Sequence, residues 1–172
     1  NMMLIDSFSS SEAIGLGQSV SAGDSAADTA SFALGVAARV VRDDGSDVEP
    51  GSGERGRVAV GGHVPIGYYK DPEKSASTFI QIDGKSYSCP GDWATVEADG
   101  SITLLGRGSV CINTAGEKVF PEEVEEALKT HASVYDAVVV GVPDDRFGET
   151  IAAVVQPTEG SSIDADELVA HT

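Results

Sequence analysis

The chain has 172 residues, enough for one domain, or for one domain and part of another. Its 28 acidic and 11 basic residues give a formal net charge of −17, which argues against nucleic acid or an anionic membrane surface as a partner. No apolar run approaches the roughly 20 residues that a membrane-spanning helix needs. The first ten residues lack the basic start of a signal peptide. We therefore expect a soluble globular protein.

The ends and the cysteines add two expectations. Cys89 and Cys111 have no metal-ligand spacing and no secretory context, so we expect reduced thiols and a cytoplasmic protein. The first residue is Asn1, and the last residues, "DELVAHT", stop inside a predicted helix. We therefore expect a piece of a longer chain.

The first hundred residues predict mainly strands and turns. Periodicity is weak over residues 1–35, where only an apolar start is evident. A strand is predicted over Val36–Val41 and another over Arg57–Val60, with Asp44-Gly45 as a turn after the first. A short helix is predicted near Pro72, and "WATVEADGSITLLG" predicts a hairpin around Asp99-Gly100.

The pattern changes after Arg107. Pro121 predicts a helix start, and the glutamates that follow it suit the positive end of a helix over 121–128. Strands are predicted over 134–142 and 150–157. A last helix is predicted after Asp164, with Glu167 completing a capping box. The order helix–strand–strand–helix indicates a small, incomplete α+β domain that begins within residues 107–110.

Five stretches together carry a family resemblance. They are "DSFSSSEAIGLG" (6–17), "GYYKDPEKSASTF" (67–79), "GDWATVEADGSITLLGRGS" (91–109), "AGEKVFPEEVEEAL" (115–128) and "VVVGVPDDRFGE" (138–149). In this order they resemble the adenylate-forming enzymes, specifically acyl-CoA synthetases (fatty-acid–CoA ligases). The sequences of these stretches are most similar to those of actinobacterial members, including members that act on steroid side chains.

The resemblance implies an α+β fold in two parts. Residues 1–107 would be the β-rich end of the large AMP-binding domain, and residues 108–172 an incomplete, mobile C-terminal domain. Gly108 and Ser109 would form the hinge between them, where small residues can absorb large backbone rotations. Relatives often carry Asp or Lys at the position of Ser109.

The resemblance also implies the chemistry: ATP, magnesium and CoA would serve to activate a carboxylic acid and convert it to a thioester. Asp92 would bind the ribose diol through its two acceptor oxygens. Arg107, a catalytic residue by this resemblance, would contact ribose and phosphate. Glu12, the second catalytic residue, would hold the magnesium ion, which takes one or two protein carboxylates beside phosphate.

Further nucleotide contacts would come from the first stretch. Phe8 would lie against the adenine, and Ser10 and Ser11 would donate to the α-phosphate or the acyl carbonyl. Ser9 replaces the glycine that is usual there. In the second part, Ala115, Gly116 and Glu117 would border the channel for CoA, with Ala115 in place of a second glycine.

The resemblance is partial, which limits the expected activity. The family's glycine-rich phosphate loop and its C-terminal lysine are not found in the sequence, so we expect the isolated chain to be inactive. Two alternatives stay open: an adenylation domain that serves a carrier protein, or a noncatalytic nucleotide-binding or interaction module of the same fold. The replacements Ser9, Ser109 and Ala115 favour the second alternative.

Overall fold

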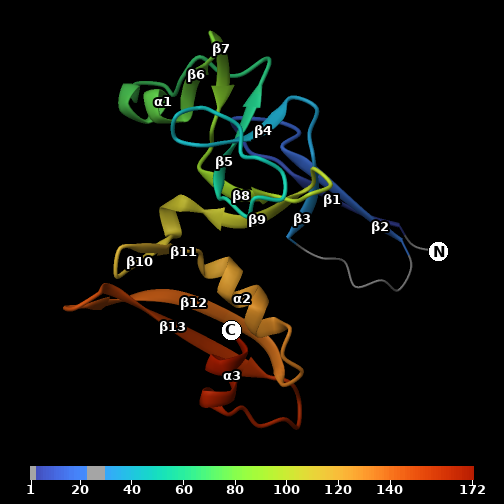
Figure 1. Ribbon diagram of the computed structural model, residues 1–172, viewed down its shortest axis with the longest axis vertical. Coiled ribbons are helices and arrows are strands. Elements are labelled where there is room, and N and C mark those ends of the chain that lie inside the picture. Colours follow the sequence, from blue (N-terminus) through green and yellow to red (C-terminus); the bar gives the residue numbers. More distant parts are fainter. Residues whose placement is uncertain (1–2, 23–29) are drawn as a thin grey trace. The chain divides into compact units, whose positions relative to one another are not determined.

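The computed structural model describes residues 3–22 and 30–172 (Figure 1). The chain forms two compact units, Asn1–Leu105 and Gly106–Thr172. Each has its own sheet and its own hydrophobic core, and each is described by itself. The assignment of residues 1–107 and 108–172 to a large domain's end and a small mobile domain stays a prediction.

The first unit is an antiparallel sheet with a single helix among its described residues. The strand order is β1-β2-β3-β9-β8-β5-β7-β6, with β4 paired to β5. The strands are β1 (Met3–Phe8), β2 (Gly17–Ala22), β3 (Ser31–Leu34), β4 (Ala38–Val41), β5 (Gly56–Gly61), β6 (Phe79–Ile82), β7 (Lys85–Ser88), β8 (Asp92–Val96) and β9 (Ile102–Arg107). Helix α1 (Pro72–Thr78) precedes β6.

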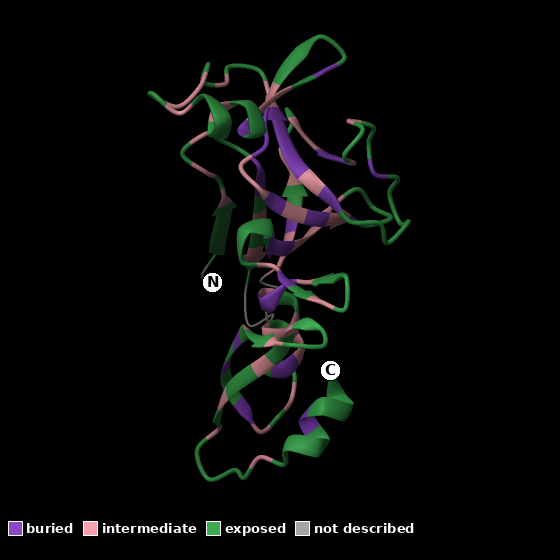
Figure 2. Ribbon diagram, turned by 90° about the vertical axis from the view of Figure 1, so that its left-hand side faces the viewer, coloured by how far each residue is buried: buried purple, intermediate pink, exposed green. Residues whose placement is uncertain are grey.

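The core of the first unit surrounds its central strands, because one cluster contains Val58 and Val60 of β5 and a second contains Ala59 of the same strand. Alternate residues of β8 are buried, so that Ala94 and Val96 join Val58 and Val60 of β5 in one cluster (Figure 2). Along β8 this alternation is the period-two pattern of a strand whose one face is more buried than the other. It places Asp92, the first residue of β8, on the same buried face.

Turn chemistry predicted part of the local structure of this unit. The turn at Gly45 (φ +85°) and the hairpin turn at Gly100 (φ +86°) are confirmed. Helix α1 is also confirmed, with Asp71 as its N-cap accepting from Lys74 N. The expectation missed the β6–β7 hairpin, where Asp83 (φ +50°) and Gly84 form the two-residue turn.

The β1–β2 hairpin was not expected either. Residues 1–35 showed little periodicity, yet Met3–Phe8 pairs with Gly17–Ala22 over its whole length. Met3, Leu4 and Ile5 are 65%, 58% and 55% exposed, so both faces of β1 face outward. A strand without a buried face has no alternation to read from the sequence.

The second unit is the α+β fold that the sequence predicted. Its sheet has the order β11-β10-β13-β12, formed by β10 (Ile112–Thr114), β11 (Glu117–Val119), β12 (Val134–Asp144) and β13 (Gly148–Pro157). The helices are a 3-10 turn η1 (Gly108–Val110), α2 (Pro121–Lys129) and α3 (Ala165–His171). Buried residues of α2, α3 and the sheet share one cluster: Ile112, Leu128, Val134, Ala137, Val139 and Leu168.

Two details of this unit differ from expectation. The stretch before α2, for which no strand was predicted, is the β10–β11 hairpin. Asp164 caps α3 as predicted, accepting from Asp166 N at 2.9 Å. The Glu167 carboxylate, however, lies 3.5 Å from Nε2 of His131 instead of completing a capping box, so it links α3 to the residues after α2. None of the helices in the described residues is long and apolar enough to cross a membrane.

Candidate functional site

The loop between β1 and β2 presents Glu12. Its backbone is closed by a reciprocal pair of hydrogen bonds: Ser10 N donates to Ala13 O at 2.9 Å, and Ala13 N donates to Ser10 Oγ at 3.1 Å. Ala13 is buried in the core of the unit. Glu12 is therefore anchored on both sides, with its side chain half-buried.

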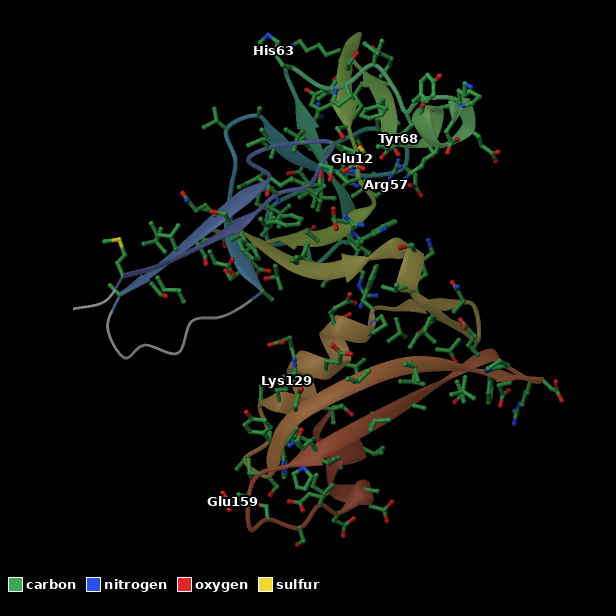
Figure 3. The ribbon with its side chains drawn as sticks, turned by 180° about the vertical axis from the view of Figure 1, so that it is seen from behind. Glu12, Arg57, His63, Tyr68, Lys129 and Glu159 are labelled. Carbon is green, nitrogen blue, oxygen red and sulfur yellow. The ribbon has the colours of Figure 1, made fainter. Side chains whose placement is uncertain are left out.

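Tyr68 is the main partner of the Glu12 carboxylate. The Tyr68 hydroxyl donates to Glu12 Oε1 at 2.6 Å, a short, charge-assisted hydrogen bond (Figure 3). This bond, more than any other contact, lowers the pKa of Glu12, and Ser10 and the more distant charge of Lys74 act in the same direction. Glu12 is thus held as a carboxylate near neutral pH.

Tyr68 is itself held by helix α1. Its backbone N–H donates to Ser75 Oγ at 2.7 Å, and that hydroxyl in turn donates to the carbonyl of Asp71 at 2.5 Å. The Lys74 ammonium lies 4.3 Å from the centre of the Tyr68 ring, and the Phe79 ring lies 5.4 Å from it. These contacts restrain both the backbone and the ring of Tyr68.

A cavity of about 390 Å³ opens beside Glu12. It is lined by Ser11, Glu12, Ala13, Ile14, Ala37, Val60, Gly61, His63, Val64 and Pro65. Its walls come from the Glu12 loop, the end of β5 and the loop that follows β5. No chemical role was predicted for His63 from the sequence. In the structure His63 lines this cavity.

Glu12 could act as a magnesium ligand because its carboxylate has acceptor directions that Tyr68 does not use. A carboxylate offers about four lone-pair directions, and Tyr68 uses one of them on Oε1. Residues 3–22 and 30–172 contain no group of three or more His, Cys, Asp or Glu side chains that could hold a metal ion by themselves. A single carboxylate beside a cavity suits Mg²⁺ that arrives with phosphate and keeps several waters.

The other predicted residues of the first stretch lie close to Glu12 in the chain. Ser10 uses its hydroxyl to close the loop, whereas Ser11 is exposed and lines the cavity. The Phe8 ring lies 5.6 Å from the Phe32 ring and packs against the core. Its contact with an adenine stays a prediction.

Asp92 is 5% exposed at the start of β8. Gly91 before it has φ +106°, a conformation that favours glycine, so the backbone turns sharply into the strand. The neighbouring residue Trp93 pairs with Arg57 of β5, whose far end lines the cavity. A buried carboxylate at a strand start is suited to a specific hydrogen-bonding role.

The predicted residues Arg107, Gly108 and Ser109 belong to the second unit. Arg107 is extended (φ −90°, ψ 130°) and exposed, and it precedes the 3-10 turn Gly108–Val110. Cys111 after that turn is extended again (φ −61°, ψ 131°). The predicted hinge is therefore one short helical turn between two extended residues.

The predicted CoA-binding residues form the tip of the β10–β11 hairpin. Thr114 pairs with Glu117, and Ala115 (φ +52°) and Gly116 (φ +89°) form the two-residue turn. Positive φ at both central positions is typical of the type I′ hairpin turn, whose backbone twist matches the twist of the flanking strands. Ala115, Gly116 and Glu117 are exposed.

Tyr68 and Lys74 are the site residues that sequence reasoning missed. Both lie in "GYYKDPEKSASTF", a stretch that carried the family resemblance but received no chemical role. Tyr68 and Glu12 are 56 positions apart in the sequence, and no local sequence pattern predicts a contact between residues so far apart.

Comparison with known proteins identifies the chain's relatives. Residues 123–172 match the AMP-binding enzyme C-terminal domain family. The chain is 61% identical over 132 residues to a Mycolicibacterium smegmatis protein named medium/long-chain-fatty-acid–CoA/3-oxocholest-4-en-26-oate–CoA ligase, covering 77% of this chain and 24% of the relative. A Mycobacterium marinum protein of the same name is 51% identical over 170 residues, which is 98% of this chain and 31% of the relative.

The chain also matches a solved structure. Apo MatB from Rhodopseudomonas palustris matches 97% of this chain and 33% of its own, with 26% identity and a TM-score of 0.69. The chain thus spans about a quarter to a third of the length of the proteins that it matches.

Proposed function

This chain belongs to the adenylate-forming, AMP-binding enzymes as their C-terminal part, and from that premise we propose that its parent protein is an ATP-dependent acyl-CoA synthetase. The observation that carries the proposal is Glu12, an ionised carboxylate fixed by Tyr68 beside a cavity of about 390 Å³. Such a group suits magnesium-bound phosphates.

The proposed reaction has two steps. In the first, a carboxylate oxygen of the acid attacks the α-phosphorus of ATP, the bond to the bridging oxygen breaks, and pyrophosphate leaves with its electron pair. In the second, the sulfur of CoA attacks the carbonyl carbon of the acyl-adenylate. The thiol proton is lost, the acyl C–O bond breaks, and AMP leaves. The products are AMP, pyrophosphate and the acyl-CoA thioester.

Residues of the first unit would serve adenylate formation. When bound, magnesium would neutralise phosphate charge as the α-phosphorus is attacked. Glu12 would hold that ion, and Asp92 would accept hydrogen bonds from the ribose hydroxyls. Phe8 would lie against the adenine. Ser10 and Ser11 would donate to the α-phosphate or the acyl carbonyl.

Residues of the second unit would serve both steps. Arg107 would contact ribose and phosphate with its planar, permanently charged guanidinium. Gly108 and Ser109 would act as the hinge, because the 3-10 turn that they form is short and flanked by extended residues. The hairpin tip Ala115–Gly116–Glu117 would border the channel for the CoA thiol.

The relatives suggest the acid. The names of both include medium- or long-chain fatty acids and a steroid with a carboxylated side chain, 3-oxocholest-4-en-26-oate. We extend both acid classes to the parent protein. Free Cys89 and Cys111 and the substrates ATP and CoA support a cytoplasmic location.

The test is ATP–pyrophosphate exchange by the full-length protein, first with fatty acids of medium and long chain and then with the steroid acid. We expect exchange with at least one acid class and thioester release only when CoA is added. Transfer to a carrier protein without any use of CoA would identify the alternative adenylation domain. The absence of exchange with every acid would favour the noncatalytic module and refute the proposed function.

A further inference from the structure

We propose that Tyr68 is a positioning residue for magnesium-bound phosphate, and that helix α1 sets the place of the Glu12 carboxylate through it. The proposal rests on the proposed function in assigning Glu12 to the metal. It goes further by naming a residue and a helix that have no role in the scheme above.

The first step of the argument is the geometry of the contact. The Tyr68 hydroxyl meets Glu12 Oε1 at 2.6 Å, within the range of short hydrogen bonds to a carboxylate. It occupies one lone pair and leaves the other acceptor directions of the carboxylate for further partners. Carboxylates that ligate metals are commonly held by such a second hydrogen bond, which fixes their orientation.

The second step is that the loop alone does not fix this orientation. The hydrogen bonds between Ser10 and Ala13 restrain the backbone of the Glu12 loop. At the carboxylate itself, the contacts from Ser10 and the Glu12 N–H are weaker than the one from Tyr68, and a glutamate side chain loses much rotamer freedom when it is held in one place. The Tyr68 hydroxyl supplies the restraint at the far end of that side chain.

The third step is that Tyr68 is held more firmly than a surface tyrosine. Its N–H donates to Ser75 Oγ at 2.7 Å. Its ring contacts the Lys74 ammonium, 4.3 Å from the ring centre, and the Phe79 ring, whose centre is 5.4 Å away. Ser75 and Lys74 belong to α1, whose N-cap is Asp71. Helix α1 therefore holds Tyr68 in place, and Tyr68 in turn holds the Glu12 carboxylate.

Tyr69 provides a matched control on the same loop. It follows Tyr68 directly, is 88% exposed, and has its ring beside Lys70. Replacement of either tyrosine by phenylalanine removes one hydroxyl and keeps the ring. Of these two hydroxyls, the one on Tyr68 donates to Glu12.

The experiment compares Tyr68→Phe with Tyr69→Phe in the full-length protein. We expect Tyr68→Phe to raise the Mg²⁺ concentration for half-maximal ATP–pyrophosphate exchange about 10-fold, while the rate at saturating Mg²⁺ changes less than about threefold. Tyr69→Phe should change neither quantity. Ser75→Ala, which releases the backbone of Tyr68, should shift the Mg²⁺ requirement in the same direction by a smaller factor.

A binding measurement separates this proposal from the proposed function. Paramagnetic resonance titration with Mn²⁺ and ATP reports metal binding without turnover, and we expect Tyr68→Phe to weaken it about 10-fold. In a Glu12→Gln background, Tyr68→Phe should have no further effect, since the two side chains act as one unit. The proposed function fails if the wild-type protein binds Mn²⁺ with ATP but exchanges no pyrophosphate.

Three results would overturn the role of Tyr68. The first is Mn²⁺ binding that is equal in Tyr68→Phe and Tyr69→Phe. The second is tighter binding in Tyr68→Phe, which would mean that the phenol competes with the metal. The third is a wild-type protein that does not bind Mn²⁺ with ATP at all.

Discussion

The backbone N–H of Ala115 donates to the carbonyl of Phe147 at 2.9 Å, so the tip of the β10–β11 hairpin is fastened to the connection between β12 and β13. Thr114 pairs with Gly148 beside this bond. The hairpin tip is therefore part of the sheet of its unit and not a loose loop. Ala115 nevertheless has φ +52°, the left-handed conformation that disfavours residues with a Cβ.

Ala115→Gly should relieve this strain. The left-handed conformation costs roughly 1–2 kcal/mol for a residue with a Cβ, and glycine loses part of that gain through greater freedom in the unfolded chain. We expect a net increase in the free energy of unfolding of about 0.5–1 kcal/mol, measured by urea denaturation.

The neighbouring turn residue gives the opposite test. Gly116 has φ +89°, and an added Cβ would meet no atom within 4 Å, so Gly116→Ala introduces strain without a clash. It should lower the free energy of unfolding by about 1 kcal/mol or more. Equal effects of the two substitutions would contradict the left-handed turn.

Asp92→Ala should abolish adenylate formation in the full-length protein. In its proposed role, the buried Asp92 carboxylate would accept charge-assisted hydrogen bonds from two ribose hydroxyls, each worth about 1.5–3 kcal/mol, so the exchange rate should fall at least about 100-fold. Glu97→Gln, at an exposed glutamate one residue beyond the end of β8, is the control and should keep the wild-type rate. An Asp92→Ala protein that exchanges normally would remove Asp92 from the site.

The sequence predicted the parts of the fold that depend on local chemistry. Pro72 and Pro121 begin helices as expected, and the Asp-Gly pairs at 44–45 and 99–100 form turns. In each case the structure is decided within about four residues, by a missing N–H, a cap or a positive φ. The same rule would have found the β6–β7 hairpin at Asp83-Gly84, which was overlooked.

Other parts depend on contacts between distant segments and left no readable pattern. Strand β1 could not be predicted, because both of its faces are exposed. A strand is recognised in a sequence by the alternation of apolar and polar residues that burial of one face produces. The family resemblance named Glu12, but the Tyr68 hydroxyl and the α1 residues that hold Tyr68 come from the connection between β5 and β6. Only the folded chain brings these side chains together.

Ser109→Pro should separate the two half-reactions of the full-length protein. Proline fixes φ near −65°, which suits the 3-10 conformation of residues 108–110 and opposes rotation away from it. Pyrophosphate exchange should stay within about threefold of wild type, whereas thioester formation should slow about 10-fold or more, as expected when a hinge is stiffened. Single-turnover measurements of each step check this, and equal losses in both steps would contradict a hinge at Ser109.

The two Asp-Gly-Ser turns predict a matched pair of titrations. Asp44 and Asp99 each accept from the hydroxyl and the N–H of the serine two residues on, at 2.6 and 2.9 Å. The Ser101 hydroxyl, and then its N–H, lower the pKa of Asp99, and Ser46 lowers the pKa of Asp44 in the same way. Both carboxyls should titrate below the ordinary aspartate value of about 3.9 in a carbon-detected NMR titration.

The sign of the stability change follows from these lowered pKa values. The folded chain holds the Asp99 proton less tightly than the unfolded chain, so this turn stabilises the fold above the unfolded pKa and loses its contribution as the pH falls through the folded pKa. Ser101→Ala should raise the pKa of Asp99 toward its ordinary value and leave Asp44 unchanged. If Asp99 titrates normally in the wild type, or if Ser101→Ala shifts Asp44 equally, the serine is not the cause.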